Sequence, residues 1–165
     1  MGIEIRIGNE DEIVIAHQLM KEAFEEYRYL DVPSSAVNEP IDILRKSYLN
    51  GTERFILCFL DEVPVGSLRF MLQDDSIYFS RVSVPPYARR KGIAKSMLKW
   101  LEYYANKQGK TKAVCKVRAS LTDNVRLYES IGYVITKEEI VKNPNGFEVK
   151  TVIMENSNLL VRREG

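Results

Sequence analysis

Apolar residues recur at two different spacings along the chain, and these spacings predict short strands and amphipathic helices. Ile3, Ile5 and Ile7 alternate with polar residues, which is the period-two pattern of a strand with one buried face. Between residues 13 and 27 the apolar residues recur instead at helical spacing, which predicts a helix. A second helical stretch begins near residue 41 and ends near Gly51.

The remaining patterns predict the order of elements in the whole chain. Two β-rich runs at 55–60 and 63–72 flank Asp61 and Glu62, so we expect a hairpin there. Further strands are predicted at residues 77–84, 113–117, 133–140 and 147–154, and further helices at residues 86–108 and 123–130. The resulting order, β-α-α-β-β-β-α-β-α-β-β, predicts a mixed α/β fold. We expect a single domain over residues 1–165, with a loose tail at 156–165.

The composition is that of an ordinary soluble protein, with 45% apolar and 28% charged residues. Because 24 basic residues oppose 23 acidic ones, the net charge is +1, and we expect neither a nucleic-acid partner nor an anionic membrane. The chain begins with no basic segment followed by an apolar stretch, and no apolar run approaches ~18 residues. We therefore expect a cytoplasmic protein.

The sequence offers few ligands for a metal. It contains one histidine and two cysteines, so we expect no metal cofactor. Cys58 and Cys115 each lie in an apolar, strand-like run, where we expect buried free thiols rather than a redox pair or a nucleophile. His17 lies within the first predicted helix and is interpreted as structural.

Residues 82–97 carry the strongest chemical signal, because a predicted strand, a loop and a helix start follow one another there. The first turn of a helix has backbone N–H groups without intrahelical partners and a partial positive charge, so it can bind a phosphate. Gly92 and Ala94 remove side-chain bulk where the oxygens of an anion would arrive. Four cations fall within seven residues: Arg89, Arg90, Lys91 and Lys95.

Two interpretations of these cations stay open. They could simply be solvated, but the helix dipole opposes a cation at this end of a helix by about 0.3 to 1 kcal/mol. A phosphate-bearing ligand would offset that cost, and we prefer this interpretation. The spacing of a nucleotide P-loop and that of the dinucleotide fingerprint are both absent from residues 82–97.

The predicted strand before this loop changes its pattern halfway. Ile77 and Phe79 place apolar side chains at odd positions, whereas Val82 and Val84 place them at even positions. A period-two pattern can change face only if the strand bends or gains a residue, so we expect a β-bulge near residues 80 and 81. The alternative is a strand that is buried on both faces.

The loop residues resemble a known signature. Val84 and the segment Arg89 to Ala94 are similar to V-x-P-x-x-[RQ]-x-x-G-x-[GA] of the GNAT superfamily of acyl-CoA N-acyltransferases, with the usual spacing if Pro86 is the reference proline and one extra residue if it is Pro85. In that family the backbone amides hold the pyrophosphate of acetyl-CoA. The resemblance implies that role for Arg89, Arg90, Lys91, Gly92, Ile93, Ala94 and Lys95.

The resemblance also assigns the bulged strand. In GNAT proteins strand four is bulged and splays from strand five, and the wedge between them accepts the pantetheine arm. This implies that Val82 and Val84 offer backbone groups to the acetyl-pantetheine end of acetyl-CoA. The Val82 amide is then a candidate to polarise the thioester carbonyl.

A second motif lies near the end of the chain. Asn124 and Tyr128 are four residues apart, and hence on one face of a short predicted helix. With Gly132 and Tyr133 they resemble the N-x-x-x-Y-x-x-x-G-[FY] region of GNAT proteins, in which the asparagine contacts pantetheine and the tyrosine often protonates the departing thiolate. A phenol with a pKa near ~10 can donate that proton at neutral pH. The alternative is that Tyr128 only packs in the core.

The resemblance implies an N-acetyltransferase with acetyl-CoA as its co-substrate. The acetyl group would pass by direct attack, in a ternary complex, to a primary amine of a small molecule or peptide. Acceptor specificity would come from residues 27–40 and 142–147, and a homodimer would be in keeping with similar proteins. The alternatives are a catalytically silent acyl-CoA sensor and, least favoured by the overall charge, a nucleic-acid-binding module.

The resemblance does not identify a general base in this sequence. Many relatives carry a glutamate on strand four near the bulge, but the comparable positions here are Tyr78, Ser80 and Arg81. Three carboxylates in the region between the first two helices are candidates instead, and a water chain is another route for the proton. These candidates are Glu26, Asp31 and Glu39.

Overall fold

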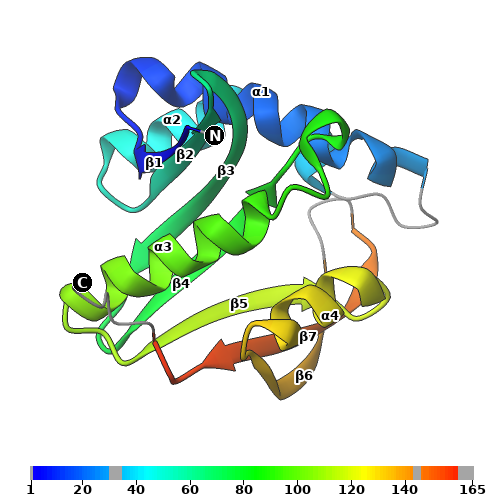
Figure 1. Cartoon of the computed structure of the whole chain (residues 1–165). Coiled ribbons are helices and arrows are strands. Elements are labelled where there is room, and N and C mark those ends of the chain that lie inside the picture. Colours follow the sequence, from blue (N-terminus) through cyan, green and yellow to red (C-terminus); the bar gives the residue numbers. More distant parts are fainter. Residues whose placement is uncertain (1, 30–34, 143–145, 160–165) are drawn as a thin grey trace. The chain divides into compact units, whose positions relative to one another are not determined.

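The computed structural model describes residues 2–29, 35–142 and 146–159 (Figure 1). The chain forms two compact units, one made of Met1–Met71 and Ser80–Trp100, the other of Leu72–Phe79 and Leu101–Gly165. The single domain expected from the sequence stays a prediction, and the last residues of the expected tail lie outside the described part of the chain.

Helices and strands together form a mixed α/β fold. The strands are β1 (Ile3–Ile7), β2 (Arg54–Leu60), β3 (Val63–Leu72), β4 (Ser76–Ser83), β5 (Lys112–Arg118), β6 (Val134–Lys142) and β7 (Glu148–Asn156). The α-helices are α1 (Ile13–Phe24), α2 (Ile41–Leu49), α3 (Ile93–Lys107) and α4 (Thr122–Ser130). Short 3-10 turns lie at Glu10–Glu12, Glu25–Tyr29, Ser35–Asn38 and Pro86–Ala88. The seven strands belong to one mixed sheet.

The first unit contains three neighbouring antiparallel strands, β1, β2 and β3. Ile5 pairs with Cys58, and Ile56 pairs with Leu68. The predicted hairpin is confirmed, because Asp61 and Glu62 form a two-residue turn with φ angles of 50° and 72°. Positive φ at both central residues belongs to the type of turn whose twist matches that of paired strands.

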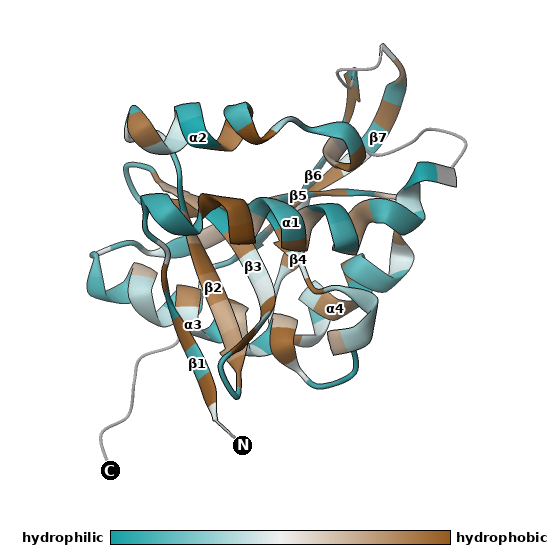
Figure 2. Cartoon of the chain, turned by 90° about the horizontal axis from the view of Figure 1, so that it is seen from above, coloured by the Kyte–Doolittle hydropathy of each residue, from teal (hydrophilic) through white to brown (hydrophobic). Residues whose placement is uncertain are grey.

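The core of the first unit comes from α1, α2 and β2. Residues from these three elements form one buried apolar cluster: Ile13, Ala16, Leu19, Leu44, Phe55 and Leu57. Figure 2 shows the corresponding hydrophobic colouring of β1, β2 and part of α1. Removing this apolar area from water is the main force that fixes α1 on the strands.

The second unit contains the other sheet edge. β4 pairs in parallel with β5 from Ser76 to Tyr78, β5 pairs antiparallel with β7, and β7 pairs antiparallel with β6. Inside this unit the buried Glu102 carboxylate accepts hydrogen bonds from Tyr133 Oη at 3.1 Å and from Asn156 Nδ2 at 3.3 Å. This carboxylate therefore has two protein donors, as a buried charge requires.

One predicted boundary is wrong. The helix expected over residues 86–108 begins at Ile93, because the chain first makes a 3-10 turn at Pro86–Ala88. Arg90 and Gly92 then adopt left-handed φ angles of 64° and 72°, which a right-handed helix cannot include. The seven residues before Ile93 are consequently a loop.

Both cysteines are buried and free, as predicted. Burial raises the pKa of Cys58 to about 11 and that of Cys115 to about 12. Neither thiol therefore ionises near neutral pH. In the described part of the chain no helix is long and apolar enough to cross a membrane.

Candidate functional site

The loop between β4 and α3 is held open by its own backbone geometry. The Ala88 amide donates to the Pro85 carbonyl at 2.9 Å, and the Arg89 amide donates to the Pro86 carbonyl at 3.3 Å. Arg90 and Gly92 follow in left-handed conformations. Gly92 suits this conformation because it has no Cβ, whereas Arg90 adopts it as a non-glycine residue.

The backbone amides at the start of α3 are available to a ligand. The first amide of this helix with a backbone acceptor is that of Ser96, which donates to the Gly92 carbonyl at 3.0 Å. Within the described residues, no acceptor is recorded for the amides of residues 90–95. Such N–H groups, at the positive end of a helix, form an anion-binding position.

Little side-chain bulk obstructs these amides. A Cβ built on Gly92 would meet no atom within 4 Å, so the space beside this residue is open. Arg90, Lys91 and Lys95 are exposed, and none of them forms an ion pair with any described residue. The loop thus combines free N–H groups with three uncompensated positive charges.

Arg89 has a different role from the other three cations. Its guanidinium donates to the Val84 carbonyl at 2.9 Å and to the Ala23 carbonyl at 3.0 Å. It also pairs with the Glu26 carboxylate at 2.9 Å. The contacts with Ala23 and Glu26 tie the loop to the end of α1 and the turn that follows it, and the contact with Val84 fixes the side chain to its own segment. The Arg89 side chain thus positions the loop and is not free for a ligand.

The end of β4 departs from a regular strand where the sequence predicted a bulge. Arg81 has a φ of 52°, and the Ser83 hydroxyl donates to the Arg81 carbonyl at 2.8 Å. Pairing with β5 is confined to Ser76–Tyr78. Val82 and Val84 are half-buried, and the Val84 carbonyl already accepts from Arg89. The Val84 carbonyl, one of the backbone groups expected to contact the pantetheine arm, is therefore already hydrogen-bonded within the protein.

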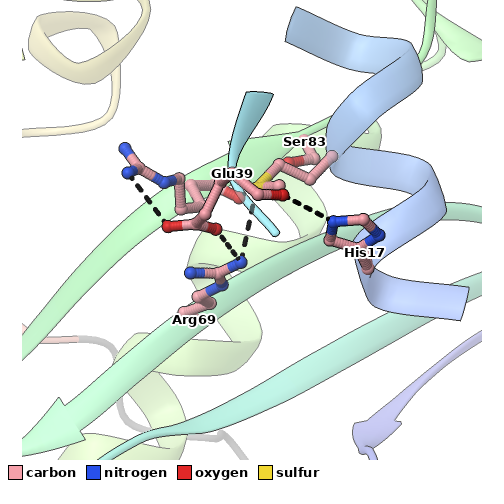
Figure 3. Close-up of polar contacts among 6 residues, drawn as sticks. His17, Glu39, Arg69 and Ser83 are labelled. Carbon is pink, nitrogen blue, oxygen red and sulfur yellow. Dashed lines mark hydrogen bonds and ion pairs between the residues drawn. The ribbon is translucent and has the colours of Figure 1, made fainter. Parts of the chain in front are cut away.

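A polar cluster lies beside this irregular segment, and Glu39 is at its centre (Figure 3). One oxygen of the Glu39 carboxylate accepts from Arg69 Nη2 at 2.5 Å, and the other accepts from Arg81 Nη2 at 3.3 Å. His17 Nε2 lies 2.8 Å from the Glu39 carbonyl oxygen. This contact gives His17 the structural role that the sequence suggested.

The two arginines control the charge on Glu39. Burial alone would raise the pKa of this carboxyl, but the hydrogen bond and charge of Arg69, together with those of Arg81, hold the pKa below its ordinary value. A carboxylate with a lowered pKa is a weak proton acceptor. Glu39 is therefore a structural anion, and it is poorly suited to be the general base.

Sequence reasoning did not single out Arg69. Its side chain is only 6% exposed, and it is the one charged residue in the otherwise uncharged run of β3, Val63–Leu72. A charge that interrupts a strand of this kind must find a buried partner, so its position was a usable signal. The partner itself, Glu39, lies 30 residues away and could not be identified from the pattern.

In the second unit, Asn124 and Tyr128 both lie on α4, as predicted. Tyr128 is 8% exposed, and its ring contacts those of Phe79 and Tyr133, with centroids 5.9 Å and 6.0 Å away. Asn124 is half-buried. These contacts hold the Tyr128 ring in one orientation, while the chemical roles of both residues stay predictions.

The structure describes two of the three candidate bases, and it also bears on a metal site. Of the three carboxylates considered as bases, Glu26 and Glu39 are both ion-paired to arginine, and Asp31 lies outside the described residues. Among the residues that the structure describes, no group of three acidic, histidine or cysteine side chains could hold a metal ion.

Comparison with known proteins places the chain in a family. The profile of the acetyltransferase (GNAT) family matches residues 15–133. No curated protein gives a significant match.

Several solved structures share the fold. The Salmonella typhimurium protein yncA, solved with its cofactor acetyl-CoA, is 18% identical with a TM-score of 0.71, over 100% of this chain and 98% of that one. The PaiA N-acetyltransferase of Thermoplasma acidophilum, in complex with coenzyme A, is 17% identical with a TM-score of 0.74, over 95% and 99% of the two chains. A ribosomal-protein alanine N-acetyltransferase from Escherichia coli is 16% identical with a TM-score of 0.73, over 99% of both chains.

These structural likenesses are at low identity and concern the fold, which agrees with the mixed α/β fold predicted from the sequence. The family profile goes further, because it spans well over half of the 165 residues and includes both motifs singled out above. This chain belongs to the acetyltransferase (GNAT) family.

Proposed function

We propose that this protein is an acetyl-CoA-dependent N-acetyltransferase that acts on a primary amine of a small molecule or peptide. The observation that carries this proposal is the loop before α3, in which the amides of residues 90–95 have no acceptor among the described residues. Three exposed cations surround these amides, so a diphosphate would meet both hydrogen-bond donors and positive charge.

The residues of the loop fit the diphosphate of coenzyme A. Gly92 leaves open space beside its Cα, so phosphate oxygens can approach the backbone closely. Arg90, Lys91 and Lys95 would supply charge, and the amides of Gly92, Ile93, Ala94 and Lys95 would supply hydrogen bonds. Arg89 would act indirectly, by holding the loop against α1. Coenzyme A or acetyl-CoA is bound in two of the solved structures that share this fold.

Two residues have proposed roles in the chemistry, both assigned by resemblance. The acetyl thioester supplies the acyl group, and the Val82 amide would polarise its carbonyl oxygen. As the C–N bond forms and the C–S bond breaks, the sulfur needs a proton, which the Tyr128 hydroxyl would donate. Asn124, on the same face of α4, would contact the pantetheine arm.

The amine must also lose a proton, and the two candidate carboxylates in the described part of the chain are already engaged with arginines. Glu26 and Glu39 each form ion pairs with arginine, and the pKa of Glu39 is lowered by those contacts. We therefore propose that the proton leaves through water rather than directly to a side chain.

The proposal is tested by measuring both binding and turnover. Isothermal titration with coenzyme A should show one site per chain. Acetyl-CoA mixed with a panel of amino acids, peptides and polyamines should release free thiol only when a suitable amine is present. The absence of coenzyme A binding would show that the loop does not bind the cofactor.

The ion pairing of Glu26 and Glu39 favours one second candidate, a catalytically silent acyl-CoA sensor. A sensor would bind coenzyme A as tightly as an enzyme but would release no thiol with any amine in the panel. Thiol release above the rate without protein, with any amine, would exclude it.

A further inference from the structure

We infer that the acceptor amine carries a carboxylate close to the amino group, and that Arg81 binds that carboxylate. This inference rests on the proposed function, because it names the class of acceptor. It starts from an imbalance in the polar cluster around Glu39: two guanidinium groups share one carboxylate (Figure 3).

The cluster has a net positive charge in a half-buried position. Arg69 and Arg81 contribute two positive charges and Glu39 one negative charge, and neither arginine pairs with another acidic residue in the described parts of the chain. His17 contacts the Glu39 backbone carbonyl and not its carboxylate. Uncompensated charge away from bulk water is unfavourable, so an anion is expected to complete this cluster.

Arg81 rather than Arg69 is placed to meet that anion. The Arg69 side chain is 6% exposed, and its Nη2 is already engaged with Glu39 and with Met20 Sδ. The Arg81 side chain is 30% exposed, and within the described residues only its Nη2 has a hydrogen-bond partner. The accessible guanidinium of the cluster is therefore that of Arg81.

Arg81 also has an unsatisfied hydrogen-bond donor. Its Nε is buried and has no acceptor among the described residues. Leaving a charged donor without an acceptor is costly, and such groups in a native fold call for an explanation. A guanidinium offers planar pairs of N–H groups that match the two oxygens of a carboxylate, so a bound carboxylate would supply the missing acceptors after a small adjustment of the side chain.

The position of Arg81 in the chain sets where the carboxylate would lie. Arg81 precedes Val82, whose amide is proposed to polarise the thioester carbonyl, and consecutive Cα atoms are ~3.8 Å apart. Arg81 keeps a left-handed φ of 52°, a conformation that costs a non-glycine residue energy and often marks a functional position. The Arg81 guanidinium therefore lies within about one arginine side-chain length of the proposed thioester position. A carboxylate close to the amino group, as in a free amino acid, fits within that reach.

Binding of the reaction product tests this inference without requiring turnover. N-acetylalanine has a carboxylate where N-acetylalaninamide has a neutral amide. Neither compound has an ionisable amine. Titrated into the coenzyme A-loaded protein, the acid should bind about 10- to 100-fold more tightly than the amide, which is the usual effect of a hydrogen bond to a charged group. Equal affinity of the two compounds would overturn the inference.

Variants then locate the effect. Arg81→Gln should remove the preference for the acid while leaving the weak affinity for the amide unchanged. The control variant is Arg45→Gln, which removes an arginine of the same unit. Among the described residues Arg45 pairs with Asp42 alone, so this variant should keep the full preference. A preference that survives in folded Arg81→Gln protein, as judged by its circular dichroism, would show that another residue binds the carboxylate. If Arg81→Gln does not fold, the comparison of the two ligands on the unmodified protein still decides whether the acid is preferred.

The same compounds separate this inference from the proposed function. If amines are acetylated but N-acetylalanine and N-acetylalaninamide bind equally well, the inference about Arg81 fails and the proposed acetyltransferase activity is supported. If coenzyme A binds and the acid is preferred but no amine is acetylated, the site recognises the carboxylate and the catalytic proposal fails.

Discussion

Replacing Gly92 with alanine separates the conformational role of this residue from its role in binding. With a φ of 72°, alanine at this position must adopt the left-handed conformation, which costs about 1 to 2 kcal/mol. No steric cost adds to this, because the new Cβ would meet nothing within 4 Å. For a chain of this size each kcal/mol lowers the melting temperature by about 2 to 4 °C.

Gly51 provides a matched control in the same unit. Its φ is 78°, and a Cβ added there would also meet nothing within 4 Å. Gly51→Ala should therefore lose as much stability as Gly92→Ala. Chemical denaturation followed by circular dichroism would compare the two variants.

The two variants should differ in their affinity for coenzyme A. A methyl group at Gly92 occupies the open space in which phosphate oxygens would approach the amides, and a hydrogen bond to a charged group contributes about 1.5 to 3 kcal/mol. Losing one such bond weakens binding roughly 10- to 100-fold. Isothermal titration should show this loss in Gly92→Ala and unchanged affinity in Gly51→Ala. Equal affinities in the two variants would refute the assignment of the loop as the diphosphate site.

Four further predictions concern Arg89, Tyr128 and the two cysteines. Arg89→Ala removes three contacts to the end of α1 and to Val84, so it should destabilise the fold by about 1 to 3 kcal/mol in urea unfolding, against almost no change for Arg45→Ala. Tyr128→Phe should lower kcat by about 100-fold or more at unchanged coenzyme A affinity, and an unchanged kcat would remove it as the proton donor. Cys58 and Cys115 should not react with a disulfide reagent at pH 8 until the protein unfolds, because burial keeps both thiols protonated. Their raised pKa values also mean that stability should fall as the pH rises above 9, where the unfolded thiols ionise first.

Local patterns were sufficient where short-range chemistry decides the structure. The hairpin at Asp61 and Glu62 and the strand before it follow from turn residues between two β-rich runs. The bend at Arg81 was visible because apolar residues change parity within one strand. The start of α3 was not, because the left-handed φ of Arg90 leaves no mark in the residue types.

Contacts between distant residues could not be predicted in the same way. The loop motif predicted a set of cations, but it could not separate Arg89 from its neighbours. That distinction depends on Ala23 and Glu26, which lie more than 60 residues earlier in the chain. Similarly, the carboxylate of Glu39 was considered as a base, and only its pairing with Arg69 and Arg81 shows why its pKa is lowered.

Under the proposed function, the exposed cations at the start of α3 lower the thermal stability of the free protein while they raise its affinity for coenzyme A. In the free protein they face the positive end of a helix, so acidic replacements at Lys91 and Lys95 would complement the dipole and make the empty protein more heat-resistant. If Lys91 and Lys95 bind coenzyme A as proposed, engineering guided by melting temperature alone would accumulate these replacements and lose affinity for the cofactor. A stabilisation campaign on this fold should select in the presence of coenzyme A, so that a variant is rewarded only when it still binds.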